Sequence, residues 1–102
     1  MPMPTYALLT NYTAEGIKQF KERNAGAQGY QRWQQLAEAL GCQVKSAYIT
    51  MGRFDGVAII EAPDDTSMAR LALAMGRSGV WSTETLRAFP AAEIGDLAAG
   101  IP

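Results

Sequence analysis

Two side chains of this sequence could carry out chemistry on a small molecule: the carboxylate of Asp55 and the guanidinium of Arg87. Asp55 lies in the stretch MGRFDG, residues 51–56, just before an apolar run. A carboxylate in a dry pocket can abstract a proton, and a guanidinium can stabilise the oxyanion that results. This pair would suit a cofactor-independent monooxygenase or isomerase acting on a reactive carbonyl or phenolic substrate. Whether the chain is an enzyme stays open at this point.

Each of these residues also has a structural interpretation. Gly52 and Gly56 can adopt positive φ, and Asp-Gly is a strong turn dipeptide, so Asp55 is first expected to hydrogen-bond the backbone of its own turn. Arg87 is first expected to form an ion pair with an acid of a neighbouring strand or subunit, which in this sequence could be Glu61, Glu84 or Asp55. Otherwise its guanidinium could bind the carboxylate of a ligand.

The composition argues against several other kinds of site. The 102 residues include no histidine, the commonest general base, zinc ligand and proximal haem ligand. We therefore expect no metal and no cofactor, and we expect the single cysteine, Cys42, to be a buried small side chain rather than a reactive thiol. Nine basic and ten acidic residues almost cancel without forming a basic block, so no nucleic-acid partner is expected. The sequence predicts neither a membrane span nor a signal peptide, and a cytoplasmic protein is the expectation.

The first elements that position these residues follow from hydrophobic periodicity. Residues 6–12 form an apolar run with aromatic ends, which predicts a strand, and Thr13 is expected to cap the helix that follows. Residues 24–29 contain two glycines and should interrupt the helical pattern. A second helical segment ending at Gly41 is predicted from a core-facing stripe at helical spacing. The stripe consists of Tyr30, Trp33, Ala37 and Leu40.

The second half of the sequence predicts two adjacent strands, a helix and a last strand. Residues 43–51 and 54–62 are separated by so short a link that the two strands must be antiparallel. Asp64 and Asp65 are better explained as helix-capping acids than as a catalytic pair. Residues 80–89 are rich in β-formers and predict the last strand. The residues of the intervening helix that should face the core are Met68, Leu71, Ala72 and Met75.

The predicted order is therefore β-α-β-β-α-β, an α+β fold of the ferredoxin-like type. In this arrangement one four-stranded antiparallel sheet carries two helices on one face. We expect residues 1–102 to form a single domain with a core of about residues 5–90 and a tail of residues 91–102 that could make one short helix.

Helices on one face leave the other face of the sheet uncovered by its own chain. A face exposed to solvent normally shows polar residues alternating with buried apolar ones, and these strands lack a uniformly polar side. By alternation, Val44, Ser46 and Tyr48 should share one side of their strand, and Thr85 should share the side of Arg87. The simplest cover is a second copy packed sheet against sheet, which predicts a homodimer or a higher homo-oligomer. The semi-polar space enclosed in this way would suit a small molecule.

The sequence also resembles a known family. Gly52-Arg53-Phe54-Asp55 is similar to the Gly-x-Tyr-Asp signature of the GYD domain family, and the blocks LLTNYTAEGIKQF, YITMGRFDGVAIIEAPDD and LALAMGRSGVWSTETLRAF resemble the same family over roughly residues 5–90. The resemblance implies a ferredoxin-like fold of the dimeric α/β-barrel group. That group includes cofactor-independent monooxygenases, haem enzymes, isomerases and ligand-sensing domains. Phe54 replaces the signature tyrosine, so a family function that needs the phenol would be lost here, whereas ring packing would survive.

The sequence therefore predicts a small cytoplasmic protein that binds a small organic ligand as a sheet-packed homo-oligomer. The first alternative is the cofactor-independent enzyme that uses Asp55 as base and Arg87 as anion stabiliser. The second is a structural or partner-binding module without a ligand. The residues expected to line the ligand site are Tyr48, Phe54, Asp55, Thr85 and Arg87, with Gly52 and Gly56 shaping the turn.

Overall fold

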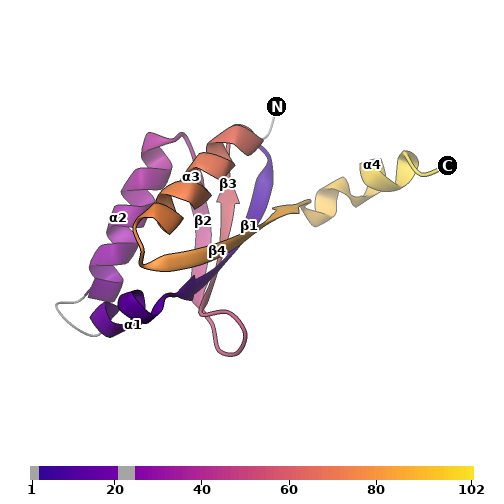
Figure 1. Ribbon diagram of the computed structural model, residues 1–102. Helices are drawn as coiled ribbons and strands as arrows, with labels where there is room; N and C mark the ends of the chain where they lie inside the picture. The colour runs from indigo at the N-terminus through magenta and orange to yellow at the C-terminus, as the bar shows by residue number, and fades with distance from the viewer. Residues whose placement is uncertain (1–2, 21–24) are drawn as a thin grey trace.

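Four antiparallel strands form one sheet in the order β2-β3-β1-β4, and the helices α2 and α3 cover one of its faces (Figure 1). The structure is a computed structural model that describes residues 3–20 and 25–102. The elements are β1 (Thr5–Tyr12), α1 (Ala14–Phe20), α2 (Ala25–Ala39), β2 (Gln43–Ile49), β3 (Gly56–Glu61), α3 (Asp65–Arg77), β4 (Trp81–Ala88), η2 (Ala91–Glu93) and α4 (Ile94–Ala99). This is the ferredoxin-like α+β fold that the sequence predicted.

Two polar side chains begin α1 and α3 as expected. The Thr13 hydroxyl accepts a hydrogen bond from the Gly16 backbone N–H at 3.0 Å and donates to the Gly79 carbonyl at 2.6 Å. The Asp64 carboxylate accepts from the Ser67 backbone N–H at 2.8 Å, and this hydrogen bond holds the pKa of Asp64 below its usual value. Thr13 therefore caps α1 and also fastens it to the turn between α3 and β4.

The predicted inward stripe of α2 is confirmed in its centre. Trp33 and Ala37 are buried and Leu40 is partly buried against the core, whereas Tyr30 is 37% exposed. The interruption expected at residues 24–29 lies partly outside the described residues, and from Ala25 the chain is already helical. Gly41 has φ +78°, the left-handed conformation that glycine adopts most easily after a helix.

The core lies between the helices and the sheet. It is formed by one face of β1 and β3 together with α2 and α3, and Cys42 is buried in it as expected. Its largest fully buried side chains are Leu8, Ile60, Met68 and Leu71.

A β-bulge changes the pattern of β2. Strict alternation placed Val44 on the same side as Ser46 and Tyr48, but the register shifts between Val44 and Ser46. Val44 pairs with Ile60 and packs against the core, while Tyr48 pairs with Val57 on the other face of the sheet. The prediction was wrong for Val44 because a bulge inserts one residue and reverses the alternation on one side of it.

The connection between β2 and β3 is longer than predicted. The strands end at Ile49 and restart at Gly56, and the Thr50 backbone N–H donates to the Asp55 carbonyl at 2.9 Å across the base of the loop. Gly52 has φ +99°, as its turn role requires, but among the described glycines Gly56 is not one with positive φ. Gly56 is needed for space instead, because a Cβ there would lie 2.7 Å from the Thr10 hydroxyl.

The residues after β4 form a C-terminal arm (residues 90–102) that projects away from the sheet and helices (Figure 1). The predicted short helix is present as α4, which packs mainly against the adjacent η2 turn. Because of this arm the radius of gyration is 14.9 Å, compared with about 13 Å for a compact domain of this length.

Candidate functional site

Asp55 connects the end of β1 to the loop before β3 through hydrogen bonds. Its carboxylate accepts a hydrogen bond from the Tyr12 backbone N–H at 2.9 Å. Its own backbone N–H donates to the Thr10 carbonyl at 2.9 Å and to the Asn11 side-chain oxygen at 3.1 Å. The carboxylate thus binds the backbone, but the backbone of another strand rather than that of its own turn.

Phe54 lies in the same loop and is half-buried. The Thr50 hydroxyl donates to the Phe54 carbonyl at 2.6 Å, which holds the loop closed, and the Arg53 guanidinium lies 5.7 Å from the centre of the Phe54 ring. The conformation of residues 52–55 is therefore held mainly by hydrogen bonds to the backbone. These hydrogen bonds do not depend on a phenol at residue 54.

Arg87 lies at the opposite end of the sheet, on the helix-covered face. Its guanidinium donates to the carbonyls of Thr5, at 3.0 Å, and Ala88. The guanidinium carbon lies 4.3 Å from the centre of the Phe89 ring and 5.5 Å from that of Tyr6. Among the described residues the ion pair found is Lys45–Glu61, at 3.8 Å, and it does not include Arg87.

One protomer does not bring Asp55 and Arg87 together. Asp55 contacts Tyr12, whereas Arg87 pairs in register with Tyr6, six residues earlier on the same strand. At the rise of an extended strand this separates them by roughly 20 Å. Thr85 pairs with Leu8 and faces the helices, so the five residues predicted to line one ligand site are spread over both faces and both ends of the sheet.

A contact that the sequence did not predict joins β1 to α3. The phenol of Tyr6 donates a hydrogen bond to the Asp65 carboxylate, and Tyr6 is buried. Burial, followed by this hydrogen bond and the negative charge of Asp65, raises the pKa of Tyr6 to about 12. Asp65 is thus more than a residue of the first helical turn, because it also anchors α3 to the centre of the sheet.

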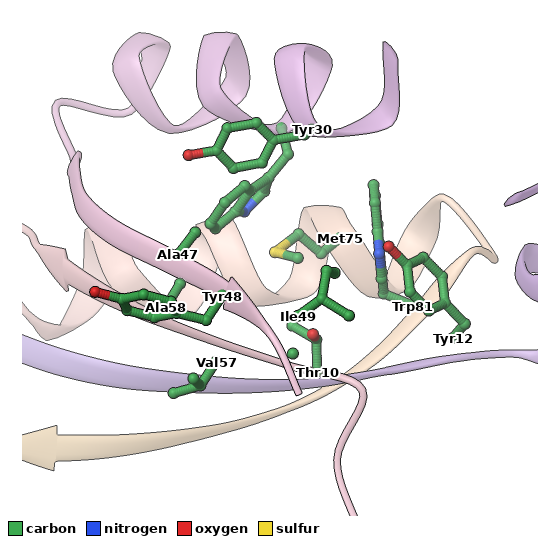
Figure 2. A pocket seen from close by; sticks show the side chains of 12 residues that line it. Thr10, Tyr12, Tyr30, Ala47, Tyr48, Ile49, Val57, Ala58, Met75 and Trp81 are labelled. Atoms are coloured by element: carbon green, nitrogen blue, oxygen red, sulfur yellow. The ribbon is translucent and has the colours of Figure 1, made fainter. Parts of the chain in front are cut away.

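A cavity of about 370 Å³ lies between the helices and the sheet (Figure 2). Aromatic residues and small residues make up most of its wall, and burial raises the pKa of one of its phenols, Tyr12. The residues that line it are Thr10, Tyr12, Tyr30, Trp33, Ala47, Tyr48, Ile49, Gly56, Val57, Ala58, Met75 and Trp81.

Of the predicted ligand residues, the cavity includes Tyr48, and Gly56 of the predicted turn also lines it. The pairing of Tyr48 with Val57 places both side chains on the face of the sheet away from the helices. From their helical spacing in the sequence, Tyr30, Trp33 and Met75 were expected to be core residues. One feature of the sequence could have indicated the cavity. Large residues on the helices face glycine and alanine on the strands, and this combination leaves space between them.

Two absences apply to the part of the chain that the structure describes. No group of three or more potential metal-binding side chains is found within residues 3–20 and 25–102. Within the same residues, none of the helices combines the length and the hydrophobicity needed to cross a membrane.

The family model described as GYD domain matches residues 6–98. The chain belongs to the GYD domain family. The match includes Gly52-Arg53-Phe54-Asp55, the segment in which the sequence resembles the family signature, and it extends into α4. In this GYD domain the signature aspartate is Asp55, the residue that fastens β1 to the β2–β3 loop.

A curated relative and a solved structure, both from Thermus thermophilus, are similar to this GYD domain. The relative is a glutamine synthetase and cystathionine beta-lyase binding protein, 30% identical over 99 residues, which are 90% of this chain and 95% of the relative. The solved structure is the crystal structure of TTHA0845, which matches with a TM-score of 0.51 at 27% identity, over 87% of this chain and 96% of that chain.

Proposed function

We propose that this GYD domain is a homo-oligomeric module that binds a metabolic enzyme. The observation that carries the proposal is the similarity, over almost the full length of both chains, to a protein named for binding glutamine synthetase and cystathionine beta-lyase. This was the second alternative from the sequence. The partner-binding alternative is favoured over the enzyme alternative because Asp55 and Arg87, the pair that the enzyme would need, are far apart. Both side chains also form hydrogen bonds with the backbone.

Homo-oligomerisation is supported by the surface that one protomer exposes. A folded monomer of 11.0 kDa should expose about 5,600 Å², whereas this protomer exposes 7020 Å². The protomer leaves uncovered both the C-terminal arm and the side of the sheet opposite the helices, which we call the open face. Its apolar residues come from all four strands: Ala7, Leu9, Tyr48, Val57, Ile59 and Leu86.

We assign the open face to a second copy of the chain. Tyr48 is 66% exposed and Leu86 is 46% exposed in one protomer, although each is a large side chain with substantial apolar area. Two such faces packed together would form an interface of sheet on sheet, in which the same patch serves both subunits. This is the sheet-packed homo-oligomer that alternation along the strands predicts.

We assign the C-terminal arm to the enzyme partner. Ile94, Leu97 and Ile101 are 60%, 46% and 72% exposed, and a helix as short as α4 is not stable in water on its own. A short helix with an apolar side is suited to a hydrophobic groove on another protein. The arm therefore offers a contact that remains available after the open face is covered.

The test measures binding of purified glutamine synthetase and of purified cystathionine β-lyase from the same organism to the immobilised chain by biolayer interferometry. We expect at least one enzyme to bind saturably. Leu97→Glu should weaken binding, while Gly95→Glu, which adds the same charge to the other side of α4, should not. Absence of binding by both enzymes to the intact chain would overturn this function.

A second candidate function is binding of a small organic ligand, as the sequence suggested. The cavity between the helices and the sheet favours it, because its volume of about 370 Å³ falls within the roughly 300–1,000 Å³ of small-molecule sites. Native mass spectrometry of gently purified protein tests this candidate. A small molecule retained at one per subunit would support it, and protein that stays empty after incubation with candidate ligands would contradict it.

A further inference from the structure

The chemistry of the cavity wall restricts what the cavity could hold. Its floor is formed by the helix-facing sides of the strands, where Ala47, Gly56 and Ala58 are small. The rings of Tyr30 and Trp81 and the thioether of Met75 lie around the space between α2 and the sheet (Figure 2). The space exists because large residues of the wall face small residues of the floor.

The absence of charge in the described part of the cavity wall is the first restriction on the ligand. Among the described residues that line the cavity, none has an ionised side chain at neutral pH. A carboxylate or ammonium group held against this wall would lose part of its hydration without gaining an opposite charge, which is unfavourable. The wall therefore favours a neutral ligand.

Shape and polarity are the second restriction. Aromatic rings come from three separate elements, with Tyr12 on β1, Tyr30 and Trp33 on α2, and Trp81 on β4. Flat surfaces of this kind pack well against another ring. The Thr10 hydroxyl and the phenols supply hydrogen-bonding groups for one or two polar atoms of a ligand.

Trp33 gives an independent observation. The residue is buried, and its indole N–H has no hydrogen-bond partner among the described residues. An unpaired buried donor is costly, and such a group in a native protein calls for an explanation such as a bound water or ligand. Because Trp33 lines the cavity and its indole nitrogen is buried, the ring would have to turn for its N–H to reach an acceptor held there.

We propose that this cavity binds a neutral one- or two-ring aromatic molecule bearing a hydroxyl or carbonyl oxygen, which accepts a hydrogen bond from the Trp33 indole N–H. The proposal rests on the second function above and names the ligand class for that site. The size fits, because about 370 Å³ is at the small end of the range for ligand sites.

The test uses 2-naphthol as the neutral probe and 2-naphthoate as the charged probe of the same ring size. Amide and indole N–H signals of the full chain are followed by two-dimensional NMR, with the two tryptophan signals assigned through Trp33→Phe. We expect 2-naphthol to shift the Trp33 indole signal saturably, and 2-naphthoate to bind at least about tenfold more weakly.

Two matched variants locate the site. Ala47→Phe places a ring in the cavity and should weaken 2-naphthol binding at least about tenfold. Ala69→Phe places the same ring on the exposed side of α3, away from the cavity lining and the open face, and should leave binding unchanged. Should Ala47→Phe fail to fold, Ala58→Val, a smaller change on the same floor, replaces it.

The possible results distinguish an error in the proposed class of ligand from an error in the location of the site. Equal binding of the two probes would overturn the neutral class and leave a ligand site standing. Shifts that persist unchanged in the Ala47→Phe or Ala58→Val variant would overturn the location. If neither probe shifts either indole signal, the aromatic ligand class is wrong, and native mass spectrometry then decides whether the site binds another kind of molecule.

Discussion

The carboxylate of Asp55 accepts a hydrogen bond from the Tyr12 backbone N–H, with 2.9 Å between Oδ2 and N, although 43 residues separate the two in the sequence. The bond joins the end of β1 to the loop that leads into β3. The signature aspartate of this GYD domain therefore holds two central strands in register at one end of the sheet. A residue used in this way can be essential to the fold without touching a substrate.

Replacing this carboxylate should destabilise the protein. Asp55→Ala leaves the half-buried Tyr12 N–H without its partner, and we expect the free energy of unfolding to fall by about 1–3 kcal/mol. Asp55→Asn keeps an oxygen acceptor and should cost less. Urea denaturation followed by circular dichroism measures both. If Asp55→Ala and the unchanged chain had the same free energy of unfolding, this hydrogen bond would contribute nothing to stability.

The buried phenol of Tyr6 makes stability depend on high pH. Its pKa is raised from 10.0 to about 12 in the folded protein, so the unfolded chain loses this proton first. The stabilisation is complete below pH 10 and is lost as pH rises from 10 to about 12. Urea denaturation across this window should show a steeper fall for the unchanged chain than for Tyr6→Phe. Tyr30→Phe, at a phenol that is 37% exposed and lies outside the open face, is the control and should retain the steep fall.

A charge on the open face should separate the subunits. Ile59 lies in the middle of this face, on β3 between β1 and β2, and Ile59→Glu would bury a carboxylate in the proposed interface. We expect its dimer dissociation constant to rise at least about tenfold in sedimentation velocity across a dilution series. Leu73→Glu adds the same charge on the exposed side of α3 and should leave the dimer intact. A dimer unaffected by Ile59→Glu would place the subunit contact elsewhere.

Restoring the signature tyrosine tests whether Phe54 marks a lost function. The ring is half-buried, and the loop is held by bonds from Thr50 and Asp55 that Phe54→Tyr does not touch. We expect the melting temperature and the binding of the enzyme partner to remain unchanged. Tighter binding of partner or 2-naphthol by Phe54→Tyr would instead assign the family phenol a direct role.

Local patterns were sufficient to predict the fold. The caps at Thr13 and Asp64 and the stripe of Met68, Leu71 and Met75 depend on neighbours in the sequence, and each was confirmed. The face to which Val44 belongs could not be predicted, because the bulge beside it depends on pairing with β3.

The candidate site was harder to predict, because its contacts link distant segments. Nothing near Asp55 in the sequence indicates that its partner is Tyr12, and nothing near Tyr6 indicates Asp65. Trp33 fits a core stripe equally well with or without a cavity beside it. The empty space arises only where its helix meets the small residues of β2 and β3.

The most direct test of the account is native mass spectrometry of the purified chain mixed with glutamine synthetase or with cystathionine β-lyase from the same organism. We expect a homodimer or larger assembly of the chain alone, and a further species that contains both the chain and one of the enzymes at a fixed ratio. A chain that remains monomeric and forms no such species with either enzyme would contradict it.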